Sequence, residues 1–182
     1  MADSTTPEIY SHWTALNKFN YGVYIVSSVA GGRINGQLAN TVFQVTAEPI
    51  RIAISINKSN LTHQYIMESG LFSISVVAES ATMIFIGLFG FRSGRDIDKF
   101  ANAAYKKSPH GCPIVTEHVV SAVAARVVEK VDIGTHTLFI GEIIHSEILS
   151  EERPMSYAYY QEHLRGKTPK ASPTFQPPVE NK

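Results

Sequence analysis

The sequence predicts a mainly β protein, a closed antiparallel β-barrel with a few short covering helices. Three observations lead to this fold class. Segments rich in Val, Ile and aromatic residues outnumber the segments with helical spacing, the helical segments are short, and the two longest strands are joined by a tight glycine turn. This combination is typical of an antiparallel barrel rather than of an α/β Rossmann layout. Closure into a barrel also removes the exposed edge strands of an open sheet.

The N-terminal segment contains one predicted helix and a strand pair. Thr6 and Pro7 fit the N-cap and first helical position of a helix over 7–17, in which apolar residues recur at helical spacing. Residues 21–28 are rich in β-forming side chains, and Gly31-Gly32 then lets the chain return as a hairpin through Ile34.

Two strands and a helix are expected next. The strands are 42–46 and 51–56, with a break at Pro49, and the regular alternation of isoleucine with other residues in 51–56 predicts that one face is more buried. Asn60 is placed to cap a helix that ends just before Gly70, where a left-handed residue is common.

The middle of the chain alternates short elements with a loop. A strand over 71–77 is followed by a short apolar helix over 81–88. Asp96 is placed to cap one or two helical turns toward Phe100, and the polar segment 102–113 is the longest predicted loop.

Two long strands close the predicted barrel. They cover 118–133 and 136–149, and Gly134 turns the chain between them into a hairpin. Beyond about residue 153 several prolines predict an extended arm. We therefore expect one domain over 1–182, with the arm as its last part.

The composition excludes several classes of protein. The chain has 182 residues, 44% apolar and 18% charged, which suits one globular domain, and its sixteen basic residues balance sixteen acidic ones. We therefore expect no nucleic-acid partner and no membrane association. One cysteine, no signal-peptide pattern and no apolar run of about 20 residues lead us to expect a cytoplasmic protein.

Four polar or glycine-rich motifs stand out from the apolar strands. They are Asn35–Pro49, Asn57–His63, Phe89–Asp96 and Gly134–Gly141. In order and spacing they resemble the FMN-binding split barrels of the flavin reductase-like family, and the resemblance extends over residues 10–175. The segments Tyr157–Tyr160 and Gly166–Lys170 resemble in particular the flavoredoxins and the flavoprotein domains that some anaerobes fuse to a rubredoxin.

The resemblance implies an architecture and a partner. It implies an antiparallel Greek-key split β-barrel that forms a homodimer, with FMN at the subunit junction. A rubredoxin module needs two Cys-x-x-Cys pairs to bind its iron, and this chain has only Cys112. Any rubredoxin partner is therefore expected to be a separate protein.

The first motif offers groups for the ribityl chain and the ring of FMN. Amide and hydroxyl groups come from Asn35, Gln37, Asn40 and Thr41, the adjacent Leu38 adds an apolar contact, and the small Ala39 lets backbone approach the ring. Turn chemistry alone is the other interpretation of such a polar segment. The resemblance favours the flavin interpretation.

The second motif is the expected phosphate site. Free N–H groups and the dipole at the start of a helix favour an anion. Lys58 just before that helix is electrostatically unfavourable unless an anion shares the site. A capped surface helix is the alternative interpretation. The expected cofactor-binding residues here are Asn57, Lys58, Ser59, Asn60, Thr62 and His63.

The third motif joins aromatic and cationic side chains around glycines. Two arginines with serine and glycine in one loop suit the binding of an anion. Three targets are open to this loop: the FMN phosphate, the isoalloxazine and the phosphates of a nicotinamide. The expected binding residues are Phe89, Phe91, Ser93, Gly94, Arg95 and Asp96.

The fourth motif contains the candidate active-site residue, His136. A lone histidine is usually structural, but in the resembling family this position lines the flavin pocket on the nicotinamide side. The remaining histidines show no spacing typical of metal ligands, so we expect no metal.

Flavin chemistry explains why the sequence contains no catalytic triad or carboxylate pair, since the cofactor itself transfers the hydride. The leading hypothesis is an FMN-dependent oxidoreductase that takes electrons from NAD(P)H and passes them to free flavin or to a small redox protein such as rubredoxin. The alternatives are a flavoredoxin-like carrier that does not oxidise nicotinamide directly, and a split-barrel protein that binds a cofactor without redox chemistry.

Overall fold

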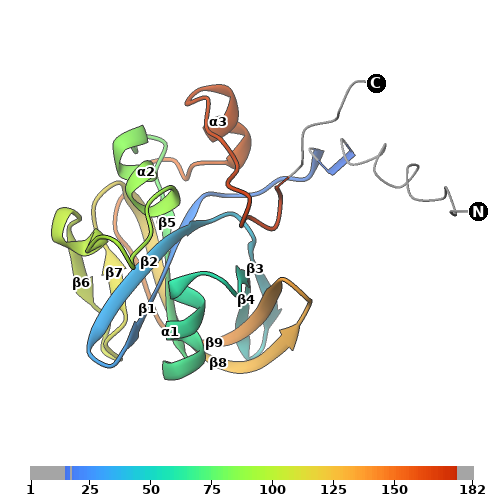
Figure 1. Cartoon of the computed structure of the whole chain (residues 1–182), viewed down its shortest axis with the longest axis vertical. Coiled ribbons are helices and arrows are strands. Elements are labelled where there is room, and N and C mark those ends of the chain that lie inside the picture. The colour runs from blue at the N-terminus through green and yellow to red at the C-terminus, as the bar shows by residue number, and fades with distance from the viewer. Residues whose placement is uncertain (1–14, 17, 176–182) are drawn as a thin grey trace, which may run out of the picture.

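The computed structural model describes residues 15–16 and 18–175, and its main feature is one antiparallel sheet of seven strands (Figure 1). The order of strands across the sheet is β2-β1-β5-β8-β9-β4-β3. The predicted mainly β, antiparallel split barrel with few short helices is therefore confirmed. The strands are β1 (Tyr24–Ala30), β2 (Arg33–Ala39), β3 (Val42–Ala47), β4 (Ile50–Asn57), β5 (Leu71–Val77), β8 (Val119–Asp132) and β9 (His136–Ile148).

The connection between β2 and β3 forces this sheet to curl. These two strands lie at opposite edges of the strand order, yet only Asn40 and Thr41 separate them in sequence. Three Cα–Cα steps reach about 11 Å. In a flat sheet with strands about 4.8 Å apart, the same edges would be roughly 29 Å apart. The two edges must therefore approach each other, which rolls the sheet into a barrel that is split at this seam.

Strands β1 and β5 are buried on both faces. Val26 packs with Phe72 and Phe139 in one cluster of the core, while its neighbour Ile25 points the other way and packs with Phe85 of the second cluster. This double burial explains why the sequence of β1 is almost continuously apolar. The same holds for the second half of β4, where the predicted alternation is wrong because Ala53 and Ser55 are buried as well as Ile54.

Within the described residues, three α-helices pack around the barrel (Figure 1). Helix α1 (Leu61–Ser69) packs on β1 and β2 and ends at Gly70, whose φ of 66° is left-handed as expected. Helix α2 (Met83–Gly90) begins at Thr82, whose side chain accepts a hydrogen bond from Phe85 N. The third, α3 (Tyr157–Glu162), lies in the segment that the sequence predicts to be an extended arm.

Two predictions for the middle of the chain are wrong. Asp98, not Asp96, caps the next turn, because its carboxylate accepts from Phe100 N at the start of the short helix η2 (Lys99–Asn102). The predicted loop over 102–113 contains the strand β6 (Tyr105–Lys107), which pairs with β7 (Pro113–Val115) in a two-stranded sheet. A three-residue strand is too short to show a period in the sequence.

The chain beyond residue 153 returns to the barrel before it forms α3. Met155 is fully buried, and its backbone bonds both Val23 and Val77. The segment therefore fits between the ends of β1 and β5 because its amide and carbonyl groups find partners there. Residues 163–175, the C-terminal segment, then reach the seam, where Thr174 Oγ1 accepts from Asn40 Nδ2. The helix predicted over 7–17 lies largely outside the described residues.

None of the helices in the described part of the chain combines the length and the apolar character needed to cross a membrane.

Gly141 on β9 is a close-packing point of the core. A Cβ at Gly141 would lie 2.6 Å from Phe72 Cε1 and 2.8 Å from Ala125 Cβ. We expect Gly141→Ala to lower the free energy of unfolding by about 1–3 kcal/mol, the usual cost of overpacking a core. Urea unfolding followed by circular dichroism measures this change.

Gly87 in α2 provides the matched control, because a Cβ there would meet only Phe91 Cδ2 at 3.7 Å. Gly87→Ala should be neutral or should raise stability by up to about 1 kcal/mol, because alanine is the better helix former. Equal stability of the Gly141→Ala variant and the wild type would show that the β9 backbone can move away from Phe72.

Candidate functional site

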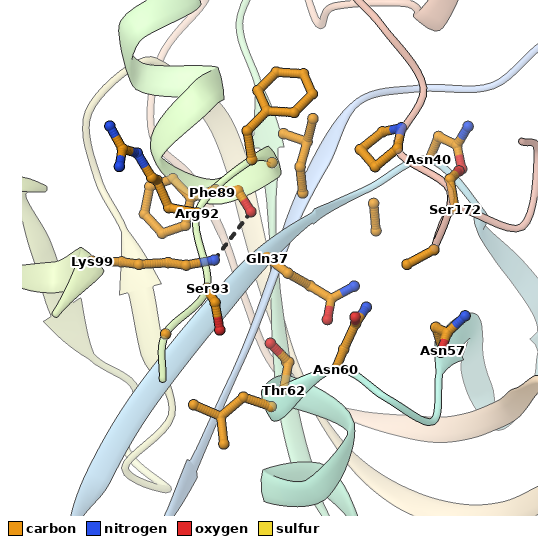
Figure 2. Close-up of a pocket in the computed structure, with 18 of the residues that line it drawn as sticks. Gln37, Asn40, Asn57, Asn60, Thr62, Phe89, Arg92, Ser93, Lys99 and Ser172 are labelled. Atoms are coloured by element: carbon orange, nitrogen blue, oxygen red, sulfur yellow. Dashed lines mark hydrogen bonds between the residues drawn. The ribbon is translucent and has the colours of Figure 1, made fainter. Parts of the chain in front are cut away.

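A cavity of about 280 Å³ lies at the seam of the barrel. Its walls come from β2, the start of α1, the end of α2 with the loop that follows it, and the C-terminal segment (Figure 2). Thirteen of the predicted site residues line it. They are Asn35, Gln37, Leu38, Ala39, Asn40, Asn57, Asn60, Thr62, Phe89, Phe91, Ser93, Gly94 and Arg95. Three motifs that are far apart in the sequence therefore meet at one place.

Strand β2 and helix α1 are joined by a buried hydrogen bond. Asn35 Nδ2 donates to Thr62 Oγ1 at 2.8 Å, and both residues are buried. Gly94 lies directly against this pair, since a Cβ there would be 1.9 Å from Asn35 Oδ1. Only glycine lets the loop after α2 approach β2 this closely. Asn35, Thr62 and Gly94 thus fix one end of the cavity.

The start of α1 faces the cavity without a side-chain cap. Asn57 Oδ1 accepts from Ser59 N and Ser59 Oγ, which turns the chain from β4 into the helix. Asn60 occupies the N-cap position, but its side chain makes no capping bond, contrary to the prediction. The Asn60 amide therefore remains available to the cavity, beside the N–H groups of the first helical turn.

The arginine loop is tied to the same helix start. Arg95 donates through one guanidinium nitrogen to the carbonyl of Ser59 at 3.2 Å, and Ser93 Oγ accepts from Arg95 N. These bonds hold the loop over the end of the cavity that Asn60 and Thr62 line. Phe89, at the end of α2, is fully buried and belongs to the apolar wall.

Lys99 is a buried cation in the wall of the cavity. It is 4% exposed, and its Nζ donates to the carbonyls of Gly36 at 2.9 Å and Phe89 at 3.2 Å. Burial lowers the pKa of Lys99 to about 8. Figure 2 shows its ammonium group directed toward the space between Phe89, Ser93 and Gln37.

The charge around the cavity is of one sign. Arg92, Arg95, Lys99 and Lys167 line it, and no aspartate or glutamate is among the described lining residues. The whole chain has a formal net charge of zero, so this cationic character is local. A cavity with these side chains suits an anionic ligand.

Gln37 has a buried polar atom without a partner. Its side-chain oxygen makes no hydrogen bond within the described part of the protein, although it lines the cavity. A buried acceptor without a donor is costly in free energy. The geometry therefore suits a ligand that brings an N–H or O–H group to this oxygen.

Six predicted residues do not line the cavity. Thr41, Lys58, Ser59, His63, Asp96 and His136 are absent from its described lining. Lys58 is paired instead with Asp132 of the β8–β9 turn, with 2.6 Å between Nζ and Oδ1. Hydrogen bonds from the Lys58 ammonium and from Gly134 N–H lower the pKa of Asp132. The positive charge of Lys58 at the start of α1 is therefore neutralised by a carboxylate of the chain itself.

His63 lies behind the wall of the cavity. It is buried, and its Nε2 lies 2.8 Å from Thr137 Oγ1. Burial lowers the pKa of His63, and the nearby charges of Lys58 and His136 lower it further. This contact joins helix α1 to strand β9.

His136 holds the C-terminal segment. Its Nε2 lies 3.1 Å from the carbonyl oxygen of Ala171, and its Nδ1 lies 2.8 Å from Thr135 Oγ1. A carbonyl only accepts, so Nε2 carries a proton. Asn40 makes a second connection, from its Nδ2 to Thr174 Oγ1 at 2.6 Å. His136 thus touches the cavity only through Ala171, which is part of its wall.

Several lining residues were missed in the sequence. Besides Lys99, these include Ser172 of the C-terminal segment and Tyr157 and Tyr160 of α3. The two tyrosines lie in the segment Tyr157–Tyr160, which carries part of the family resemblance. That resemblance was the signal from which their place in the pocket could have been predicted. Lys99 carries no local signal, because its burial comes from carbonyl groups of β2 and α2 that are distant in sequence.

The described residues contain no group of three or more side chains suited to hold a metal ion. Cys112 is 1% exposed, and burial raises the pKa of its thiol to about 12. A thiol of this kind is not a nucleophile near neutral pH. The chemistry of the site therefore depends on what the cavity binds.

Comparison with known proteins identifies the family. Residues 16–168 match the flavin reductase like domain family. A high molecular weight rubredoxin of Moorella thermoacetica is 48% identical over 161 residues, 88% of this chain and 70% of that protein. A ferric-chelate reductase (NAD(P)H) of Archaeoglobus fulgidus is 45% identical over 161 residues, 88% of this chain and 95% of that protein.

A solved structure shows the same fold. The flavoredoxin from Methanosarcina acetivorans has a TM-score of 0.65 and 24% sequence identity, over 81% of this chain and 79% of that one. The resemblance drawn from the four motifs is thereby confirmed. The chain belongs to the flavin reductase-like domain family, the class of protein that its strand order and its cavity at the barrel seam suggest.

Proposed function

We propose that the cavity binds FMN and that the protein uses it to pass electrons from NAD(P)H to free flavin or to a small redox protein such as rubredoxin. The buried oxygen of Gln37 is the observation that carries this proposal. An isoalloxazine ring carries an N–H between two carbonyl groups, and Gln37 offers an acceptor that lacks a donor. The side-chain amides of Asn40 and Asn57 line the same cavity and suit the polar atoms of a flavin.

The cationic end of the cavity supports FMN in particular. FMN ends in a single phosphate group, and Arg95, Lys99 and the uncapped start of α1 gather at one end of the cavity. Charge-assisted hydrogen bonds from such groups bind phosphate strongly. The apolar side chain of Leu38 and the exposed ring of Phe91 provide surface for the flat ring.

A bound FMN would supply the redox chemistry that the side chains of the cavity lack. The residues of the chain would bind and orient it: Gln37 would hold the edge of the ring, and the cationic groups would hold the phosphate. His136 keeps the wall at Ala171 in place through its protonated Nε2. Hydride transfer between two stacked ring systems would be direct, so no side chain is required as a general acid or base.

The names of two relatives support the proposed electron donor and acceptor. One is named a ferric-chelate reductase that uses NAD(P)H, and the other is named a high molecular weight rubredoxin. These names favour a nicotinamide as donor and either a small redox protein or an iron chelate as acceptor.

A carrier function is the second candidate. The C-terminal segment forms one wall of the cavity, and its hydrogen bonds to Asn40 and His136 hold it there. A nicotinamide that approaches from this side has to displace the wall, whereas one-electron transfer through the protein surface does not. A flavoredoxin-like carrier would therefore keep the segment closed.

One experiment separates these functions. The purified protein is loaded with FMN and mixed anaerobically with NADH and, separately, with NADPH in a stopped-flow instrument. Rapid bleaching of the flavin absorbance by either donor is expected for the oxidoreductase. A protein that binds FMN but is reduced only by a redox protein is a carrier, and one that binds no flavin contradicts the proposal.

Gln37 gives the first mutational test. We expect Gln37→Leu to weaken FMN and riboflavin about equally, by roughly tenfold, because one hydrogen bond to the ring is lost. Folding should not suffer, since the wild-type oxygen is already buried without a partner. Flavin fluorescence quenching measures both affinities. Unchanged affinities would place the ring away from Gln37.

His136 gives the second test. We expect His136→Asn to retain FMN but to slow reduction by NAD(P)H by about tenfold, or roughly 1.4 kcal/mol of barrier, because one positioned contact is lost. Stopped-flow reduction at saturating donor measures the rate. His145→Asn, which affects only a contact with Glu147, is the control. Reduction as fast as in the wild type would make His136 purely structural.

Exposed apolar side chains on strands β3 and β8 support a homodimer. Phe43 on β3 is 50% exposed and Val131 on β8 is 43% exposed, although both lie in strands. We expect a dimer at micromolar concentration in light scattering, and Phe43→Asp should shift it toward the monomer. Ile84→Asp on α2, also at an exposed position, should remain dimeric. A monomeric wild type would contradict a shared cavity.

A further inference from the structure

Lys99 is a buried ammonium group without an acidic partner. It is 4% exposed, and its two hydrogen bonds go to the carbonyls of Gly36 and Phe89. None of the ion pairs in the described part of the chain includes Lys99. An ammonium group has three N–H donors, so one remains after the two carbonyls are bonded.

The position of Lys99 is costly without a further ligand. A charged group loses hydration when it is buried, and the lowered pKa of Lys99, about 8, reflects this loss. Two carbonyl dipoles offset only part of it. Structural bracing alone does not require a charge here, since the carbonyls could be bonded by a neutral donor.

The free side of Lys99 faces the end of the cavity with the other anion-binding features. Figure 2 shows Lys99 and Ser93 on one side and Thr62 and Asn60 below them, around the same space. The helix that begins after Asn60 has nine residues, and no side chain caps its start. Arg95 is tied to this helix start through Ser59.

We propose that Lys99 supplies the buried positive charge that binds the phosphate group of the flavin. This inference rests on the proposed binding of FMN. The sequence led us to expect that Lys58 binds the phosphate, and the inference assigns this role to Lys99 instead. Lys58 is paired with Asp132 and does not line the cavity. The ligand is a phosphate monoester, and its charge takes the place of the carboxylate that Lys99 lacks.

The test compares two ligands that differ only in the phosphate. Dissociation constants for FMN and for riboflavin are measured by fluorescence quenching on wild type and on Lys99→Met. The variant should bind FMN about 10-fold to 100-fold more weakly, because a charge-assisted hydrogen bond is lost, and should bind riboflavin within about twofold of wild type. Riboflavin binding also reports that the variant is folded.

Three further variants sharpen the result. Lys99→Arg retains the charge and should recover most of the FMN affinity. Lys106→Met removes a lysine that pairs with Glu147 away from the cavity and should change neither affinity. Lys58→Met tests the rival residue: a loss of FMN affinity there, with none in Lys99→Met, overturns the inference.

The dependence on pH separates charge from structural bracing. The Lys99 ammonium is charged below its pKa of about 8 in the free protein and becomes neutral above it. The phosphate of FMN is a dianion above about pH 6. The preference for FMN over riboflavin should therefore be greatest between about pH 7 and pH 8 and should fall as the pH rises toward about 9.5. This fall should disappear in Lys99→Arg. The other charged or titratable side chains around the cavity are Arg92, Arg95, Tyr157, Tyr160 and Lys167.

The other outcomes are equally decisive. If Lys99→Met weakens FMN and riboflavin together, or weakens neither, Lys99 is a brace or a ring contact and the inference is wrong. A wild-type protein that binds both flavins with equal affinity overturns the inference but leaves flavin binding intact. A wild type that binds neither flavin overturns the proposed function as well.

Discussion

The two-residue step from β2 to β3 is the constraint on which the rest of the structure depends. It joins the two edges of a seven-stranded sheet, so the sheet has to roll, and the seam falls where Asn40 and Thr41 connect them. Strand ends that meet at a seam cannot all pair with each other. Their polar groups must find other partners, as Asn40 does when its Nδ2 donates to Thr174 Oγ1 of the C-terminal segment. The cavity lies at this seam because regular strand pairing stops there.

The electrostatics of the site depend on which charges the chain neutralises by itself. Lys58 is the lysine that local sequence makes conspicuous, yet the β8–β9 turn brings Asp132 to within 2.6 Å of it. Lys99 has only backbone carbonyls as partners and lies in the cavity wall. The difference comes from the tertiary fold: a hairpin turn supplies a carboxylate to one lysine, while the other is enclosed by α2 and β2. A neutral chain can in this way carry a strongly cationic pocket.

The sequence predicted what depends on local patterns. The hairpin at Gly31-Gly32 and the left-handed Gly70 were found because backbone freedom is a property of the residue itself. The β2 face with Asn35 and Gln37 followed from the period of a strand and from the family resemblance. The sequence did not predict α3, in place of an extended arm, or the burial of Lys99. Helix α3 begins at the N-cap Ser156 but has only six residues, too few to show a clear helical period. The burial of Lys99 has no local pattern, because it is fixed by carbonyl groups of β2 and α2 that lie far away in the sequence.

The C-terminal segment gives the cavity a wall that is not part of the barrel. Its contacts include the bonds from Asn40 to Thr174 and from His136 to Ala171, and each such bond is worth about 1 kcal/mol. The unfolding of a whole domain costs about 5–15 kcal/mol. The segment can thus detach by local unfolding while every strand stays paired. Amide protons of the segment then exchange with solvent faster than those of the paired strands. The affinity for any ligand that contacts this wall therefore depends on the local stability of the segment rather than on the stability of the whole domain.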